Sequence, residues 1–285
     1  MALCKAFTRK KIVKGILAFT ALLIAGAVFI TCVEPFSLQI TRHELIWEQL
    51  PEGLEGLTFT HLTDFHHGKV IPLGYIKKCV ARSNALSPDL VFLTGDYVSR
   101  APEYIAPCIE ALSSLKSRYG VFAVPGNHDY WTDIATTRKE FARTGIHLLV
   151  NRSDTVTIKG ASLAVIGLDD LWAGIPDMKT AAAGVSGPEK KILLMHNPDL
   201  FEEYAPLGFD LILSGHTHGG QVNIPFIGPP ITPSRFGARY AAGLYRKDKS
   251  TLYVNRGIGM VSPPIRFFCR PELAFFTIRG KPASR

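Results

Sequence analysis

Five short apolar runs along the chain are rich in β-branched residues and are bounded by Gly, Pro or Asp. They read TFTHLTD, DLVFLTGD, GVFAVPGNHD, KILLMH and DLILSGHTH. Continuous runs of this kind between turn-forming residues are typical of buried strands. Residues 74–86 and 103–117 instead place apolar side chains three or four positions apart, which predicts a helix after each of the first two strands. Strand and helix thus alternate, and this predicts an α/β fold that begins with right-handed βαβ units.

A longer apolar segment lies near the N-terminus. Residues 15–33 contain no charged side chain, and 19 residues of helix extend about 28 Å, close to the thickness of a bilayer core. We therefore predict a transmembrane helix. Five basic residues precede it and Glu34 follows it, so the positive-inside rule places the N-terminus in the cytoplasm and the rest of the chain on the outer side.

Cleavage of this segment as a signal peptide is the alternative. The segment ends without an A-x-A-like cleavage site, and residues 29–31 lack the small residue expected before a lipoprotein cysteine at Cys32. Residues 8–12 (TRKKI) also resemble a twin-arginine export signal in which Lys replaces the second Arg. The residues favour an uncleaved anchor that crosses the membrane once.

The rest of the chain is predicted to form one domain. Residues 1–33 are the basic segment and the anchor. Residues 34–56 are polar and punctuated by Pro and Gly, as in a linker with room for one edge strand, and residues 57–285 suit a single domain of ordinary size. The five cysteines are scattered, which argues against a disulfide framework.

The net charge of +8 falls to +3 once the five basic residues of 1–33 are set aside. Eleven Lys or Arg residues follow residue 210, against only Asp248 and Glu272, and they are interleaved with the apolar stretches 224–227 and 263–268. A basic and apolar surface favours an anionic lipid or a membrane surface, with a solvated basic face over ordinary strands as the alternative. No nucleic-acid-binding module is recognisable, so we expect no nucleic-acid partner.

Each of the five predicted strands ends in side chains that bind metals. In open α/β sheets ligands bind beyond the carboxyl ends of the strands, so these side chains meet if the strands are neighbours. One such motif alone is ordinary turn chemistry, but five in order predict a site for two divalent ions, bridged by Asp96. Imidazole with carboxylate and amide oxygen, without thiolate, favours Mn, Fe or Zn over Mg or Ca. The predicted ligands are Asp64, His66, Asp96, Asn127, His196, His216 and His218.

The motif order D-x-H, G-D, G-N-H-D, H and G-H-x-H resembles that of the calcineurin-like metallophosphoesterases, from residue 57 to about residue 280. The resemblance implies two facing mixed β-sheets flanked by helices, with the segments LAVIGL, TLYVNRG and LAFFTI completing the second sheet. It also implies that His128 is the catalytic imidazole, that Asp129 orients its ring, and that a metal-bridging hydroxide is the nucleophile. The implied ligands are Asp64, His66, Asp96 and His218 for the first metal, and Asp96, Asn127, His196 and His216 for the second.

Residues 215–221 (GHTHGGQ) and 263–268 (PPIRFF) extend the resemblance to membrane-anchored bacterial phosphoesterases, some related to hydrolases of UDP-2,3-diacylglucosamine in lipid A assembly. This implies a hydrolase at the bacterial cytoplasmic membrane that splits a phosphodiester or pyrophosphate bond in an anionic, lipid-linked substrate. That lipid precursor is made on the cytoplasmic side, whereas the charge pattern places the domain outside. An exported phosphodiesterase acting on phospholipid, wall polymer or nucleotide is therefore the alternative. An inactive binding module on the same scaffold is a second one, although every ligand position is filled.

Histidines outside the motifs are predicted to be structural. His67 is the exception to watch, because it adjoins His66 and a bound phosphate would lie within its reach. The others are His43, His61 and His147.

Further polar residues lie close to the motifs. Asp169 and Asp170 end another apolar run at the same rim, where a turn or N-cap role is equally expected. Arg235, Arg239 and Arg266 are candidates for phosphate contact. The sequence leaves the oligomeric state and the native metal open.

Overall fold

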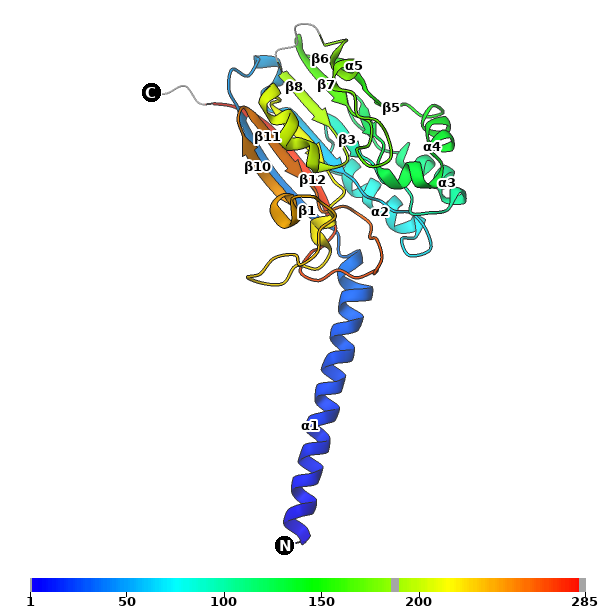
Figure 1. The fold of residues 1–285 in the computed structure, drawn as a ribbon, viewed down its shortest axis with the longest axis vertical. Coiled ribbons are helices and arrows are strands. Elements are labelled where there is room, and N and C mark those ends of the chain that lie inside the picture. The colour runs from blue at the N-terminus through cyan, green and yellow to red at the C-terminus, as the bar shows by residue number, and fades with distance from the viewer. Residues whose placement is uncertain (1, 186–189, 282–285) are drawn as a thin grey trace.

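The structure is a computed structural model that describes residues 2–185 and 190–281. It consists of a long N-terminal helix and a domain in which two β-sheets face each other, with helices on their outer sides (Figure 1). This is the predicted arrangement of two mixed sheets flanked by helices.

The first sheet has the strand order β1-β12-β2-β3-β4-β5. Strands β2 to β5 are parallel, β12 is antiparallel to β2, and the edge strand β1 is parallel to β12. Helices α2 (Leu73–Asn84) and α3 (Ile105–Leu112) are the two predicted helices, and α4 (Asn127–Phe141) follows β4. The strands are β1 (Gln39–Trp47), β2 (Thr58–Leu62), β3 (Leu90–Thr94), β4 (Val121–Val124), β5 (Ile146–Leu148) and β12 (Glu272–Gly280).

The second sheet has the strand order β10-β11-β9-β8-β7-β6. Its four inner strands are parallel, and the two edge strands β6 and β10 are antiparallel to their neighbours. Two short helices accompany it, α5 (Met178–Ala182) and α6 (Phe201–Tyr204). The strands are β6 (Arg152–Ile158), β7 (Ala161–Gly167), β8 (Lys190–Leu194), β9 (Leu211–Ser214), β10 (Gly243–Lys247) and β11 (Ser250–Val254).

The apolar core has layers on both faces of the first sheet. Between the two sheets, Phe59 and Phe92 of the first sheet pack in one cluster with Leu163 and Ile192 of the second. On its other face the first sheet packs against α2 and α3, whose buried side chains include Ile76. Strands that are covered on both faces need apolar residues at successive positions, which is why the predicted runs are continuous.

Strand β12 contains the segment LAFFTI, and its place in the first sheet corrects our prediction for the second. It pairs with β1 on one side and with β2 on the other, and Ala274, Phe276 and Ile278 belong to the cluster between the sheets. An apolar run indicates that a strand is buried, but both facing sheets contribute to the same core, so the run does not specify which sheet the strand joins. The segments LAVIGL (β7) and TLYVNRG (β11) lie in the second sheet as predicted.

Helix α1 (Ala2–Val28) continues through a π-helical turn (Phe29–Val33) and a 3₁₀ turn (Glu34–Phe36) into the domain. Only residues 37 and 38 separate the last turn from β1, and the buried Glu34 carboxylate accepts a hydrogen bond from the Cys269 amide at 2.7 Å. The segment 34–56, predicted to be a linker with room for one edge strand, therefore holds the edge strand β1 and is packed into the domain.

The stretch Lys11–Phe36 is long and apolar enough to cross a membrane, and its most apolar part is entirely exposed. This finding rests on length and composition, and an N-terminal signal sequence would share both properties.

Candidate metal centre

The five strand-end motifs meet at one edge of the two sheets. Strands β2, β3 and β4 deliver three motifs from the first sheet, and β8 and β9 deliver two from the second. The parallel strands of each sheet place their carboxyl ends together, as the sequence predicts. All seven predicted ligands are buried, with exposed fractions between 0% and 4%.

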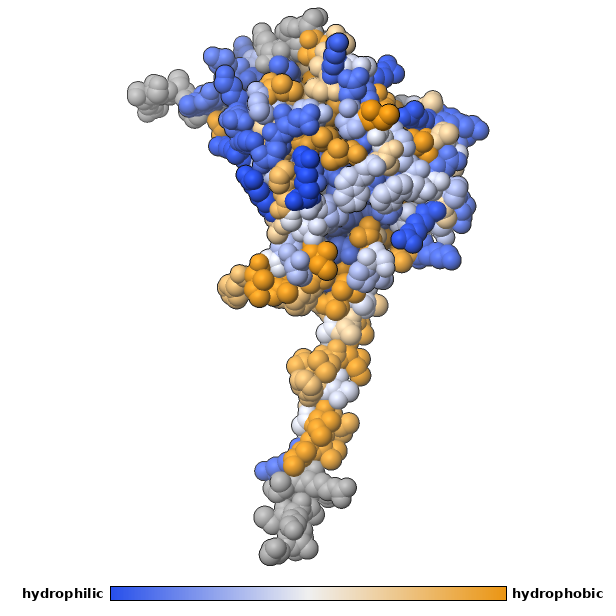
Figure 2. All heavy atoms as spheres, in the orientation of Figure 1, coloured by the Kyte–Doolittle hydropathy of each residue, from blue (hydrophilic) through white to orange (hydrophobic). Residues whose placement is uncertain are grey.

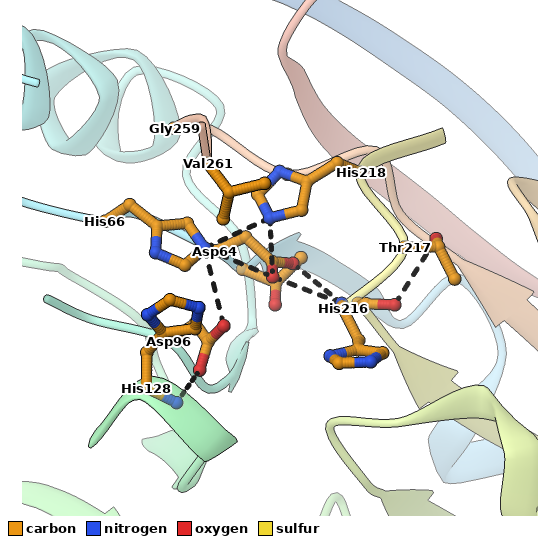
Figure 3. A network of polar contacts seen from close by, with 12 residues as sticks. Asp64, His66, Asp96, His128, His216, Thr217, His218, Gly259 and Val261 are labelled. Carbon is orange, nitrogen blue, oxygen red and sulfur yellow. Dashed lines mark hydrogen bonds and ion pairs between the residues drawn. The ribbon is translucent and has the colours of Figure 1, made fainter. Parts of the chain in front are cut away.

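Three of these side chains form a first cluster around Asp64 (Figure 3). The Nε2 atoms of His66 and His218 lie 3.0 Å apart, and the Asp64 Oδ1 atom lies 3.8 Å and 3.4 Å from them. Two imidazole nitrogens and a carboxylate oxygen that converge in this way suit a divalent cation between them.

A second cluster forms around Asp96, His196 and His216. The Nε2 atom of His196 lies 3.3 Å from Asp96 Oδ2 and 3.2 Å from His216 Nδ1. The same Asp96 Oδ2 atom lies 3.4 Å from His66 Nε2 in the first cluster. Asp96 thus stands between the two groups, which is the position that a bridging ligand requires.

One buried polar atom tests whether metals fit this centre. Asn127 Oδ1, at the cavity that Asp96 also lines, has no hydrogen-bond partner within the part of the chain that the structure describes. A buried polar atom without a partner costs free energy, so native proteins rarely leave one unsatisfied. A divalent cation would satisfy this atom, and the imidazole and carboxylate atoms of the two clusters supply the other donors, so the residues fit a metal pair.

The backbone around the ligands is strained and tightly spaced. Five of the seven predicted ligands have positive φ angles, between 48° and 69°: Asp64, His66, Asp96, His216 and His218. Non-glycine residues adopt this region at a cost, and they cluster at functional sites. Gly126 and Gly215 leave no room for a side chain, because a Cβ atom there would collide with the carboxylates of Asp96 and Asp64, respectively.

Charge in the second cluster is balanced between Asp96 and His196. Burial alone would raise the pKa of Asp96, but His196 and His66 outweigh it and hold this pKa well below its usual value. Burial alone would lower the pKa of His196, but Asp96 outweighs it and holds this pKa well above its usual value. Burial lowers the pKa of His216 to about 3, so this ring is neutral and its lone pair is available to a metal.

His128 lies beside the two clusters at the start of α4. Its Nδ1 atom is 2.8 Å from the Ser99 carbonyl oxygen, and its backbone N–H donates to Asp96 Oδ1 at 2.8 Å. A carbonyl only accepts, so the ring proton belongs on Nδ1 and Nε2 is left for another partner.

Asp129 does not orient the His128 ring, which corrects our prediction. Its Oδ2 atom accepts hydrogen bonds from the Gly126 and Asp96 amides at 2.8 and 3.0 Å, and its Oδ1 atom accepts one from the Tyr97 amide at 2.9 Å. The carboxylate therefore fastens the loop after β3 to the start of α4. Asp129 positions Asp96 and Asn127 rather than the ring.

A cavity of about 490 Å³ opens beside the two clusters, and the residues that form its outer wall were not among the predicted site residues. Trp131 and Trp172 line it, with ring centroids 6.4 Å apart, and Trp172 stands edge-on to the His216 ring at 4.2 Å. Arg100, Pro233 and Val261 also line it. Trp131 lies three residues after His128, and this helical spacing is the signal that predicts its place over the motif.

The arginines proposed for phosphate contact are engaged elsewhere. Arg266 is fully buried, and its guanidinium donates to the carbonyls of Arg256, Gly257, Gly259 and Cys269. Arg235 donates to the Asp199 carbonyl, and Arg239 forms an ion pair with Glu202. Arg100 is the basic residue that lines the cavity.

The remaining histidines contact protein groups, as predicted. His61 contacts Thr94 and His43 contacts Tyr253. His147 pairs with Asp154 on the surface. His67 Nδ1 lies 2.8 Å from the Ile71 carbonyl, so this ring is fixed in its own loop.

Asp169 and Asp170 shape the loop that holds Trp172. Asp170 Oδ1 accepts hydrogen bonds from the Trp172 and Ala173 amides at 2.8 Å, and Asp169 accepts one from the Tyr130 hydroxyl. This is the turn role that was equally expected from the sequence.

Comparison with known proteins gives one consistent result. Residues 57–220 match the calcineurin-like phosphoesterase family. The chain is 32% identical to the uncharacterized metallophosphoesterase YkuE of Bacillus subtilis (strain 168), over 97% of this chain and 99% of that protein. It is 30% identical to the phosphodiesterase YaeI of Escherichia coli (strain K12), over 86% of this chain and 90% of that protein.

A further relative is named for a diacylglucosamine compound. The chain is 30% identical to the UDP-2,3-diacylglucosamine pyrophosphatase LpxG of Chlamydia trachomatis, over 88% of this chain and 92% of that protein.

Proposed function

The chain belongs to the calcineurin-like phosphoesterase family and is a hydrolase acting on phosphoester bonds, and we propose that it uses two divalent cations to split a phosphodiester or pyrophosphate in a lipid-linked substrate at a membrane. The observation that supports this most is the convergence of six buried carboxylate and imidazole side chains, from four separate strand ends, on two adjoining clusters, with the buried Asn127 after β4 at the same cavity.

We assign the first cation to Asp64, His66, Asp96 and His218, and the second to Asp96, Asn127, His196 and His216. The metals are Mn, Fe or Zn, because the donors mix imidazole with carboxylate and amide oxygen. When bound, two such cations neutralise charge on the phosphoryl oxygens and lower the pKa of a water molecule. Asp96 holds the two halves of the centre together, with its Oδ1 atom fixed by the His128 amide and its Oδ2 atom between His66 and His196.

We assign proton transfer to His128. The Ser99 carbonyl holds its Nδ1 atom, so its Nε2 atom serves the substrate, and His128 lines the cavity beside Asp96 and Asn127. A ring fixed in this way can neutralise a phosphoryl oxygen or protonate the leaving group. Asp129 supports the reaction indirectly, through the loop that carries Asp96.

A lipid-linked substrate is supported by two independent features. The apolar segment Lys11–Phe36 suits a membrane anchor, and a relative of similar length, LpxG, is named for a diacylglucosamine substrate. The charge pattern around the anchor favours the outer side of a bacterial cytoplasmic membrane, where phospholipid, wall polymer or nucleotide is the alternative substrate. A reporter fused after residue 285, active on one side of the membrane only, decides between these substrates.

The decisive test compares Asp96→Asn with a matched control. Asp248→Asn makes the same change at an exposed position that also has a positive φ angle, 52° against 56° for Asp96. With Mn²⁺ and bis-p-nitrophenyl phosphate, we expect the purified full chain and Asp248→Asn to be active and Asp96→Asn to lose roughly a thousandfold or more in kcat/KM. Full activity of Asp96→Asn, or of the wild type in a chelator, contradicts the two-metal mechanism.

Elemental analysis separates the enzyme from an inactive binding module on the same scaffold. The enzyme should contain about two equivalents of metal per chain, in keeping with a two-metal centre. A purified protein without metal, and without hydrolysis after Mn²⁺ is added, supports the binding module.

A further inference from the structure

We propose that the loop after the last ligand, residues 222–233, inserts its apolar tip into the lipid surface, so that the metal pocket faces the bilayer and takes its substrate from it. This inference rests on the proposed function, because it specifies how a lipid-linked substrate reaches the metal centre.

Sheet topology places the membrane helix at the metal-bearing edge of the domain. Strand β1 begins at Gln39, which pairs with Glu272 at the start of β12. Strand β12 runs antiparallel to β2, so its Ala274 pairs with His61 near the end of β2, just before Asp64. The chain therefore enters the domain from α1 at the same edge to which β2 delivers its metal ligands.

The loop between β9 and β10 exposes large apolar side chains near this edge. Phe226 is fully exposed, and Ile227 and Ile231 are 77% and 79% exposed. Residues 219–234 contain no Asp, Glu, Lys or Arg. Figure 2 shows hydrophobic residues gathered at the end of the domain from which α1 leaves, continuous with the apolar surface of the helix. Soluble proteins rarely expose such a patch unless it binds a partner or a membrane.

The tip of the loop has a defined conformation. The Ile227 and Gly228 amides donate to the Ile224 carbonyl at 3.0 and 2.8 Å, which closes a tight turn. Phe226 lies within this turn and has a φ angle of 69°. Bulky residues rarely adopt positive φ angles, so the hydrogen bonds of the turn must hold the backbone in this conformation. The turn therefore presents Phe226 outward.

The apolar loop, the pocket and the membrane helix are joined by hydrogen bonds. The Gln221 side chain donates to the Val261 and Pro263 carbonyls and accepts from the Val261 amide, and Val261 lines the metal pocket. At the far end of the loop, Pro233 lines the same pocket. The Arg266 amide donates to the Ile30 carbonyl of the helical segment at 3.0 Å. Contact of the loop with lipid would thus set the orientation of the pocket mouth.

Arginine side chains also lie beside apolar residues where the helical segment meets the domain. A second cavity, of about 720 Å³, lies where the helical segment meets the domain and is lined by Phe29, Phe267 and Phe268 together with Glu34, Arg256 and Arg270. Arg256 is ion-paired with the buried Glu272 at 3.3 Å, whereas the exposed Arg270 donates to the backbone carbonyls of residues 37 and 38. Aromatic side chains next to arginine suit the boundary between lipid tails and anionic headgroups. A bilayer accounts for both features and is continuous with the apolar helix, so we favour it over a protein partner.

The first experiment compares soluble and lipid-embedded substrates with the full chain in nanodiscs of phosphatidylethanolamine and phosphatidylglycerol. The variant is Phe226→Asn with Ile227→Asn, because Asn tolerates a positive φ angle. Leu207→Asn is the matched control: Leu207 is 52% exposed and precedes β9, at the end of that strand opposite to the ligands. We expect hydrolysis of hexadecyl p-nitrophenyl phosphate to fall about tenfold in the loop variant and not in the control, because the loop tip would no longer bury apolar side chains in the lipid. Hydrolysis of bis-p-nitrophenyl phosphate should stay unchanged in both variants, and equal loss on both substrates contradicts the inference.

The second experiment measures insertion without turnover. Trp introduced by Phe226→Trp should be quenched by brominated lipid beyond the wild-type level, whereas Leu207→Trp should add unquenched emission. Absence of extra quenching overturns the inference and favours a protein partner, even if soluble phosphodiester is hydrolysed. If the Trp is quenched but the protein hydrolyses neither ester, the membrane contact is supported and the proposed function is contradicted.

Discussion

The proposed metal ligands and the outer wall of the same pocket differ in how the fold holds them. The ligands are at most 4% exposed and lie at strand ends, and five of them have strained backbone conformations that their surroundings enforce. The outer wall consists of loop and helix residues such as Trp131 and Trp172, which are 58% and 47% exposed. Buried, over-determined positions suit chemistry that requires fixed geometry, whereas exposed positions suit recognition of a substrate that varies.

Replacement of His128 should have the largest effect among residues that bind no metal in our assignment. We expect His128→Ala to lose about a thousandfold in kcat, most of all with poor leaving groups, because a general acid contributes on this scale. Metal content should stay near that of the wild type by elemental analysis. Loss of metal in parallel with activity would make His128 a ligand instead.

Gly126→Ala tests whether the position of Asp96 depends on the tight packing around its carboxylate. The added Cβ atom would collide with the Asp96 carboxylate, so Asp96 must shift. We expect roughly a hundredfold lower kcat/KM, because small misplacements at a reacting centre have effects of this size. Gly145→Ala is the control, since nothing lies within 4 Å of a Cβ atom there. Equal activity of the two variants would contradict the tight packing of the centre.

Trp131→Ala tests the outer wall. Trp131 lies 4.9 Å from the His128 ring and offers a flat apolar surface beyond the phosphate. We expect KM to rise about tenfold while kcat changes little, because such a surface binds ground state and transition state alike. The rise in KM should be smaller with p-nitrophenyl methyl phosphate, because its second ester group is only a methyl group. A fall in kcat without a change in KM would place Trp131 in the chemical step.

Arg100→Gln should have the smallest effect. Arg100 is exposed at the cavity, where its charge is screened by salt. We expect KM for an anionic diester to rise about threefold at low ionic strength and to match the wild type in high salt. Arg118→Gln, exposed just before β4 and away from the ligands, is the control. An effect that persists in high salt would indicate a direct, desolvated contact.

The sequence was sufficient to predict that the buried side chains of the five motifs meet at one edge. Strand runs that end in Asp, Asn or His specify both the element and the edge, because parallel strands place their carboxyl ends together. The same reasoning could not show that Asp129 turns to three backbone amides, or that Arg266 binds four carbonyls inside the domain. The hydrogen-bond partners of these two side chains depend on which loops pack against each other in the folded domain.

Strand β12 illustrates the same limit at the level of the fold. Its apolar residues suit either sheet, and its place between β1 and β2 is decided by pairing with segments more than 200 residues away along the chain. Periodicity is a local property, whereas sheet membership is a long-range one.

Two residues separate the last helical turn from β1, and hydrogen bonds from the Cys269 and Arg266 amides to Glu34 and Ile30 hold this end of the helix against the domain, which restricts its swing. Were that helix embedded in a bilayer, as we propose, the pocket would stay at a fixed height above the lipid and would meet substrate molecules that diffuse in two dimensions. The turnover rate would then depend on the surface concentration of substrate in the bilayer rather than on its concentration in bulk water.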